Sequence, residues 1–218
     1  MRSSATQRNE SAFSTLRRMK QPRAVEVEEH CEFCNVLIAP VHRHLLEIEK
    51  RQIICTCDAC AMRFMGVVAG RFKLIPHSAR SLPDFHMTDS QWDNFALPIN
   101  LAFLYRDTLA EKVIALYPSP AGATESLLPA QNWPALEAGN PALTKMEPDV
   151  EALLVNRVGT AREYFIAPMD ACYELVGLIR MHWRGLSGGE KVGQEMETFF
   201  AKLRADAEPA ISREASRA

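Results

Sequence analysis

The sequence predicts an α+β protein in which an N-terminal, treble-clef-like zinc module precedes an antiparallel sheet with helices on one face. Two Cys-x-x-Cys pairs frame a short segment of alternating apolar residues near the N-terminus. Paired apolar runs separated by short turns follow in the middle of the chain, and two segments of helical periodicity follow these runs. Strands followed by helices are typical of an α+β domain.

The two cysteine pairs are Cys31 with Cys34 and Cys57 with Cys60. Each pair forms a tight turn on which two sulfurs converge, and two such turns supply the four thiolates of a tetrahedral zinc site. These four cysteines are the predicted ligands. Cys55 is an alternative third ligand, because residues two apart on a strand point to the same side. The regular spacing to Cys60 favours Cys57.

Iron is the alternative metal, since a four-thiolate site also serves rubredoxin-like electron carriers. In rubredoxin, the tight Cys-x-x-Cys turns, called knuckles, usually carry glycine or proline around the cysteines. These residues allow backbone N–H groups to donate to the sulfurs. Here the knuckles read Cys-Glu-Phe-Cys-Asn and Cys-Asp-Ala-Cys-Ala. This composition favours zinc.

The segment between the cysteine pairs alternates in the manner of a β-hairpin, with a break at 49–51. Residues 58–65 are expected to begin a helix that carries the second pair at its start. A treble clef has this order of elements: a first knuckle, a β-hairpin, and a second knuckle at the N-terminus of a helix. The positive end of the helix dipole would stabilise the negative charge of zinc bound to four thiolates.

His42 and His44 lie on the first predicted strand, where treble-clef nucleases of the HNH type place a histidine general base. That chemistry also needs a metal-binding histidine or asparagine on the following helix, and residues 61–64 offer neither. We therefore expect these histidines to make hydrogen bonds or to line a partner surface.

The larger domain is predicted from turn, cap and periodicity signals. Thr88 and Asp89 are typical of a helix start, short turns between apolar runs indicate two antiparallel hairpins, and a 3.6-residue period indicates two long helices. The expected elements, in chain order, are a strand at 71–76, a helix from Thr88, hairpins at 99–105 with 112–117 and at 152–158 with 162–167, and helices at 169–183 and 192–203.

These signals divide the chain into four predicted segments. Residues 1–29 are polar and are expected to form a disordered leader, with a nucleic-acid-binding arm as the alternative. The zinc module spans 30–68, the α+β domain spans 69–205, and a flexible tail spans 206–218.

Composition restricts the class of partner. A net charge of −2 disfavours a protein that binds nucleic acid mainly through phosphates. The chain has no apolar run long enough for membrane insertion, and its N-terminus lacks the apolar core of a secretory signal. Clustered cysteines without such a signal predict metal-binding thiols in the reducing cytoplasm.

Two loops are candidates for a ligand or partner surface. The segment 118–126 is rich in small and hydroxyl residues that could expose N–H groups to an anion, although a plain strand-exit loop rich in turn formers is the favoured interpretation. The segment 182–189 could present Trp183 beside Arg184, or simply cap and link two helices. With the two histidines, the candidate surface is His42, His44, Ser119, Gly122, Thr124, Glu125, Ser126, His182, Trp183 and Arg184.

Several motifs occur in an order that resembles an uncharacterised bacterial protein family. The resemblance spans about 31–203, and the family tends to be encoded beside nickel–iron hydrogenase genes. It implies a cytoplasmic role in the assembly or support of such an enzyme, and it supplies no catalytic residues. The motifs are CEFC (31–34), HRHL (42–45), CTCDAC (55–60), LYPSPAGATES (116–126), DVEALLVNR (149–157) and GLIRMHWRG (177–185).

The expected function is therefore that of a non-enzymatic, zinc-binding accessory protein. Its expected partner is a protein, with hydrogenase subunits or maturation factors as candidates. A rubredoxin-like iron carrier for the same enzyme is the first alternative, and a treble-clef nucleic-acid binder or nuclease is the second.

Overall fold

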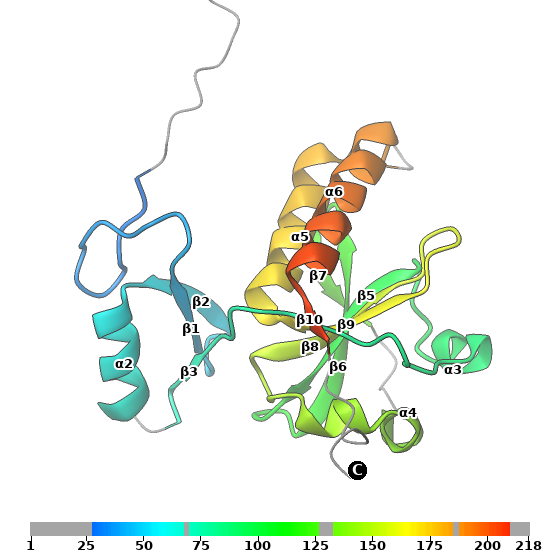
Figure 1. The fold of residues 1–218 in the computed structure, drawn as a ribbon, viewed down its shortest axis with the longest axis horizontal. Coiled ribbons are helices and arrows are strands. Elements are labelled where there is room, and N and C mark those ends of the chain that lie inside the picture. Colours follow the sequence, from blue (N-terminus) through cyan, green and yellow to red (C-terminus); the bar gives the residue numbers. More distant parts are fainter. Residues whose placement is uncertain (1–27, 68–69, 127–132, 185–187, 210–218) are drawn as a thin grey trace, which may run out of the picture.

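The computed structural model describes residues 28–67, 70–126, 133–184 and 188–209. The described residues form a three-stranded sheet with the order β2-β1-β3 and a seven-stranded sheet with the order β10-β4-β9-β8-β5-β6-β7. Figure 1 shows the small sheet and its helix to one side of the larger, helix-covered sheet. The predicted α+β class with antiparallel pairing is confirmed.

The small sheet is built on the predicted hairpin, β1 (Arg43–Glu47) and β2 (Gln52–Thr56), and helix α2 (Asp58–Val67) follows it directly. The strand expected near 71–76 is β3 (Phe72–Leu74), but it pairs with β1 and not with the larger sheet. The face of the hairpin toward α2 buries a small apolar cluster, comprising Leu45, Ile54, Ala61 and Phe72 with Phe33 and Phe64 against them.

The centre of the larger sheet consists of the two predicted hairpins. In each hairpin the strands pair antiparallel, and β5 pairs with β8 to join the two hairpins. Strand bounds are β4 (Arg80–Ser81), β5 (Leu101–Asp107), β6 (Lys112–Ser119), β7 (Gly122–Glu125), β8 (Glu151–Asn156), β9 (Glu163–Pro168) and β10 (Glu208–Pro209).

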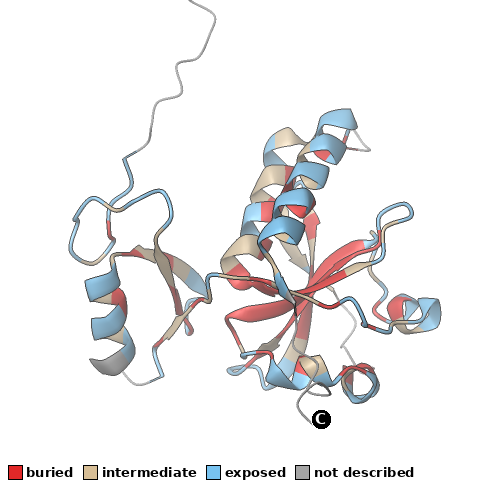
Figure 2. Cartoon of the chain, viewed as in Figure 1, coloured by how far each residue is buried: buried red, intermediate tan, exposed pale blue. Residues whose placement is uncertain are grey.

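Helices cover both faces of this sheet, so the expectation of helices on one face holds only for the two long ones. Successive residues of a strand point to opposite faces. Phe103 packs with α5 (Met169–His182) and α6 (Glu190–Asp206), whereas Leu104 faces the opposite cluster. Because both faces of the central strands are apolar, both need a cover, as the buried strands in Figure 2 show. The second cover is formed by α3 (Asp89–Asp93), α4 (Trp133–Gly139) and the 3₁₀ helix η1 (Pro141–Lys145).

The ends of the chain agree only in part with the predicted leader and tail. The leader lies outside the described residues except for 28 and 29, and 210–218 lie outside them as well. The described start of the tail is ordered, because β10 pairs with β4 in a parallel register. No helix in the described part of the chain is long and apolar enough to cross a membrane.

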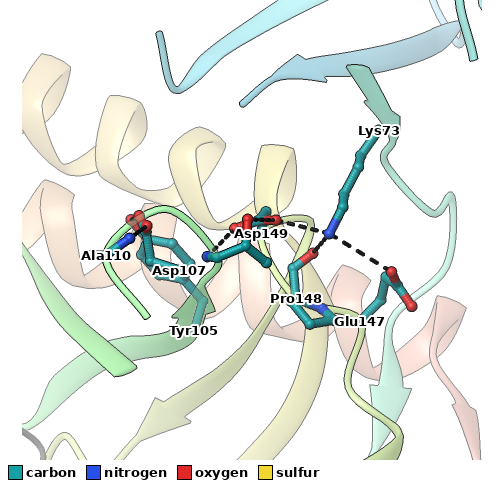
Figure 3. A network of polar contacts seen from close by, with 8 residues as sticks. Lys73, Tyr105, Asp107, Ala110, Glu147, Pro148 and Asp149 are labelled. Atoms are coloured by element: carbon teal, nitrogen blue, oxygen red, sulfur yellow. Dashed lines mark hydrogen bonds and ion pairs between the residues drawn. The ribbon is translucent and has the colours of Figure 1, made fainter. Parts of the chain in front are cut away.

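Ion pairs join the small sheet to the larger one. Lys73 on β3 extends to Asp149, with 2.8 Å between its Nζ atom and Oδ2, and its ammonium also donates to the carbonyl oxygen of Pro148 at 3.1 Å (Figure 3). In the turn between β1 and β2, Arg51 lies 2.6 Å from the carboxylate of Asp107. Both acceptor carboxylates are about 4% exposed. These contacts hold the small sheet against the larger sheet in a defined position.

The predicted helix cap at Thr88 is present, and its contribution to stability can be measured. The Thr88 hydroxyl accepts the N–H of Gln91 at 3.1 Å, and the Gln91 side chain accepts the N–H of Thr88 at 2.9 Å. Thr88→Ala should lower the free energy of unfolding by about 1 kcal/mol, measured by urea denaturation. Ser90→Ala, at an exposed position in the same helix, is the control. Equal stabilities of the two variants would contradict a stabilising role for the cap.

Candidate metal centres

The four predicted cysteines lie together. Their sulfur atoms are all within 4.8 Å of one another, and those of Cys34 and Cys57 are 3.7 Å apart. A tetrahedral zinc site with bonds of about 2.3 Å places its sulfurs about 3.8 Å apart. The first pair lies on a turn closed by the Asn35 N–H and the Cys31 carbonyl at 2.8 Å, and the second pair opens α2. The geometry is that of a four-cysteine metal site.

The backbone conformation of the two Cys-x-x-Cys turns, or knuckles, bears on the choice between zinc and iron. Asn35 follows Cys34 with a φ of 59°, the left-handed conformation that glycine most readily adopts. Asparagine tolerates this conformation. In the second knuckle, the N–H of Cys60 points at the sulfur of Cys57 at 3.5 Å. The lack of glycine therefore does not prevent a knuckle with N–H···S contacts, and it does not separate zinc from iron.

The electrostatics of the cluster favour a bound cation. Burial raises the pKa of Cys31, but backbone hydrogen bonds from Cys57, Cys34 and Phe33 outweigh it and lower the pKa to about 6. Burial, followed by the neighbouring sulfurs, raises the pKa of Cys60 to about 12. Near neutral pH, a cluster without metal would thus hold thiolate and thiol side by side. A divalent cation is what allows all four sulfurs to ionise together.

A second group of ligand-type side chains lies on the other face of the same hairpin. His44 is directly opposite Cys55 in the β1–β2 register, and His42 precedes His44 by two residues, which places it on the same face. One ligand atom from each of His42, His44 and Cys55 lies within 4.8 Å of the other two. We predicted hydrogen bonds or a partner surface for the histidines, and for Cys55 an alternative place among the ligands of the four-cysteine site. The hairpin register, once derived from the alternation, would have placed the three together.

Hydrogen bonds fix both histidine rings. The Nδ1 atom of His42 lies 2.9 Å from the carbonyl oxygen of Ala39, and its side chain is only 7% exposed. The Nδ1 atom of His44 lies 2.7 Å from the carboxylate of Asp170, in the first turn of α5. The Nε2 atom of His42 is buried, and no described residue is its hydrogen-bond partner.

Carboxylates surround this second group. The N–H of Cys55 donates to the carboxylate of Glu32 at 2.8 Å, and Glu29 lies 3.5 Å from the ring of His42. Burial raises the pKa of Cys55, and the charges of Glu32 and Glu29 raise it further. The surroundings are therefore negative and favour a cation.

The segment 118–126 is a hairpin and not the open loop that we expected. Strands β6 and β7 pair with Ser119 opposite Gly122, so that Pro120 and Ala121 form the turn. Gly122 has a φ of 118°, which suits glycine at the end of a tight turn. Strand β7 is therefore the last strand of the larger sheet and pairs with β6, where an open loop was expected.

The side chains of this hairpin are bonded within it or to its neighbours. Ser119 and Thr124 share a hydrogen bond of 2.9 Å between their hydroxyls, and Glu125 pairs with Lys112 at 3.1 Å. The hydroxyl of Ser126 donates to the carbonyl oxygen of Phe95 at 3.1 Å. These contacts stabilise the hairpin edge.

The predicted surface at 182–184 lies at the C-terminal end of α5. The Nδ1 atom of His182 is 3.1 Å from the Leu178 carbonyl oxygen, and the Arg184 N–H donates to the carbonyl of Gly188 at 3.0 Å. The ring of Trp183 packs against Gly188, where a Cβ would approach it to 3.3 Å. Asp170 is at the other end of the helix, about 18 Å away at 1.5 Å per residue. This surface is separate from the metal clusters.

Comparison with known proteins identifies a family. Searches of the curated proteins and of the solved structures found no significant match. Residues 30–207 match a family of unknown function, DUF5947, and this range includes both ligand clusters and every strand of the larger sheet except β10. The chain therefore belongs to the DUF5947 family.

Proposed function

We propose that this protein is a non-enzymatic, zinc-binding accessory protein that binds a protein partner through its metal module. The observation that carries this proposal is the concentration of exposed apolar side chains on that module. Five of the nine large hydrophobic residues that are exposed in the described part of the chain lie within 36–65. These five are Val36, Leu37, Val41, Met62 and Met65.

Such side chains suit a protein interface. Val41 is 83% exposed and Met62 is 66% exposed, so leaving them in water gains nothing for the fold. Methionine adapts to irregular partner surfaces and is enriched in interfaces. The net charge of −2 gives no support to a mainly electrostatic partner such as nucleic acid.

The proposed metal is zinc in a treble-clef-like module. Four protein thiolates fill a tetrahedral coordination shell and leave no position for a substrate, which supports a structural role. The order of first knuckle, hairpin β1–β2 and second knuckle at the start of α2 supports the treble-clef assignment. Elemental analysis and a visible spectrum of anaerobically purified protein test it. Iron with thiolate charge-transfer bands would replace this proposal with a rubredoxin-like electron carrier.

The proposed partner is a subunit or maturation factor of a nickel–iron hydrogenase, and the proposed location is the cytoplasm. The support is the resemblance carried by the motifs between 31 and 203. A binding assay with purified hydrogenase subunits and maturation factors from the same source tests this identity.

A double substitution tests the proposed surface. Met62→Asp with Met65→Asp should weaken binding to the purified hydrogenase component at least tenfold, because two charges would have to be buried in the interface. Metal content and melting temperature should not change, since both side chains are exposed. Leu109→Asp with Met181→Asp, at exposed apolar positions outside the module, is the matched control. Equal binding by both double variants would refute the module as the docking surface.

A further inference from the structure

We propose that His42, His44 and Cys55 form a second zinc site, separate from the four cysteines, with its fourth coordination position open to an exogenous ligand. Two imidazoles and one thiolate are a donor set that zinc accepts, whereas magnesium and calcium prefer oxygen. The ligand atoms of the three residues already lie within 4.8 Å of one another. Among the described residues, no fourth histidine, cysteine or carboxylate ligand atom belongs to this group.

The hydrogen bonds of the rings leave the correct nitrogens for a metal. In each histidine the Nδ1 atom is engaged, with the Ala39 carbonyl for His42 and with the Asp170 carboxylate for His44. A carbonyl oxygen only accepts, so Nδ1 of His42 carries the proton and Nε2 of a neutral ring has a free lone pair. The same tautomer in His44 is favoured by the carboxylate of Asp170. Both rings would thus offer Nε2 to the ion.

The buried Nε2 atom of His42 is the strongest sign of a missing ligand. A buried polar atom without a partner is costly, and native proteins rarely keep one. The His42 side chain is 7% exposed and ends in such an atom. A zinc ion between His42, His44 and Cys55 would satisfy it.

The surroundings match the outer shell of a metal site. Metal-binding histidines usually donate their other N–H to a carboxylate or a backbone carbonyl, which orients the ring and raises its basicity. Here His42 has the backbone carbonyl of Ala39 as its acceptor, and His44 has the carboxylate of Asp170. The nearby carboxylates of Glu29, Glu32 and Asp170 give an excess of negative charge that a dication would offset.

The site also lies between the two sheets. His42, His44 and Cys55 belong to the hairpin, whereas Asp170 comes from α5 on the larger sheet. The residues that continue this hairpin face, Leu46 and Ile53, pack on Val150 of the larger domain. The outer shell of the second site is therefore complete only when the hairpin is docked on the larger domain, and zinc bound there would reinforce that contact.

Zinc stoichiometry of the full-length protein tests the proposal. After equilibration with Zn²⁺ and removal of free ion, the unmodified chain should hold two zinc ions. His42→Ala, His44→Ala and Cys55→Ser should each hold one, because the four-cysteine site remains. His77→Ala, at an exposed histidine that belongs to neither ligand group, is the control and should hold two. One zinc ion in the unmodified chain would overturn the proposal.

A conservative substitution at Asp170 tests the second site even if the ligand variants fail to fold. Asp170→Asn keeps the shape of the side chain but weakens the support of His44, so it should lower the affinity of one zinc ion about 10- to 100-fold and leave the other unchanged. Competition with a chromophoric chelator measures both affinities. If the ligand variants lose both ions, the zinc affinities of Asp170→Asn become the deciding measurement. A lower affinity for one of the two ions supports the second site, and two unchanged affinities overturn it.

Discussion

Replacing Cys60 with serine is expected to release the metal of the four-cysteine cluster and to unfold the module around it. The module has a small apolar core, centred on Leu45, Ile54, Ala61 and Phe72. Such a core contributes little by itself. Metal binding in small zinc modules provides on the order of 10 kcal/mol, which is also folding free energy. The expected result is therefore loss of structure in residues 30–67 and not a modest loss of stability.

Metal analysis with hydrogen exchange measures this result. The variant should lose the metal of the four-cysteine cluster and the exchange protection of β1, β2 and α2, together with any zinc that the same hairpin holds through His42, His44 and Cys55. Chelation of the unmodified protein should have the same effect. Cys172→Ala is the control, because Cys172 is a buried cysteine in the core of the larger domain. It should keep the metal and cost about 1 kcal/mol for the lost sulfur. A Cys60→Ser protein with unchanged metal content and melting temperature would contradict the ligand assignment.

Replacing Asp149 with alanine is expected to cost about 3 kcal/mol, because it removes a buried carboxylate and leaves its donors without an acceptor. The carboxylate of Asp149 accepts the Lys73 ammonium at 2.8 Å (Figure 3). It also accepts the N–H and the hydroxyl of Thr108, each at 2.8 Å. Asp149 also has a φ of 70°, which alanine adopts less readily than aspartate. Equilibrium unfolding in urea measures the loss.

Two further substitutions separate the causes. Asp149→Asn keeps an acceptor for Thr108 and tolerates the positive φ, so that it should lose mainly the ionic contact with Lys73. Lys73→Met removes that contact from the other side and leaves the Thr108 hydrogen bonds in place. We expect both to cost less than Asp149→Ala and to increase exchange at β3, where Lys73 lies. An Asp149→Ala protein as stable as the unmodified one would show that this junction does not hold the two sheets together.

Local patterns were sufficient for most of the secondary structure. Alternation between the cysteine pairs predicted β1 and β2, apolar runs around short turns predicted β5–β6 and β8–β9, and helical periodicity predicted α5 and α6. The spacing of Cys31, Cys34, Cys57 and Cys60 predicted that four sulfurs would meet, and they lie within 4.8 Å. These features depend on residues close in sequence, whose geometry the chain itself restricts.

Short elements with weak local signals were less predictable. A three-residue strand carries no information about its partner, and β3 was expected in the larger domain but pairs with β1. The segment at 118–126 has the composition of a loop, yet strand β7 forms there because an edge of β6 is available to pair with. The helices on the second face of the sheet, α4 and η1, were missed because their apolar residues are few.

By itself, the sequence determined which four cysteines meet in a candidate metal site, the α+β class and the principal hairpins and helices. Only the tertiary structure decided that the hairpin face with His42, His44 and Cys55 docks on the larger domain, and that Asp170 approaches His44 from 126 positions away. The physical reason is that periodicity reports which side a residue faces, whereas packing decides what it meets there. Contacts between distant segments depend on how the small sheet docks on the larger one, and no local pattern encodes that arrangement.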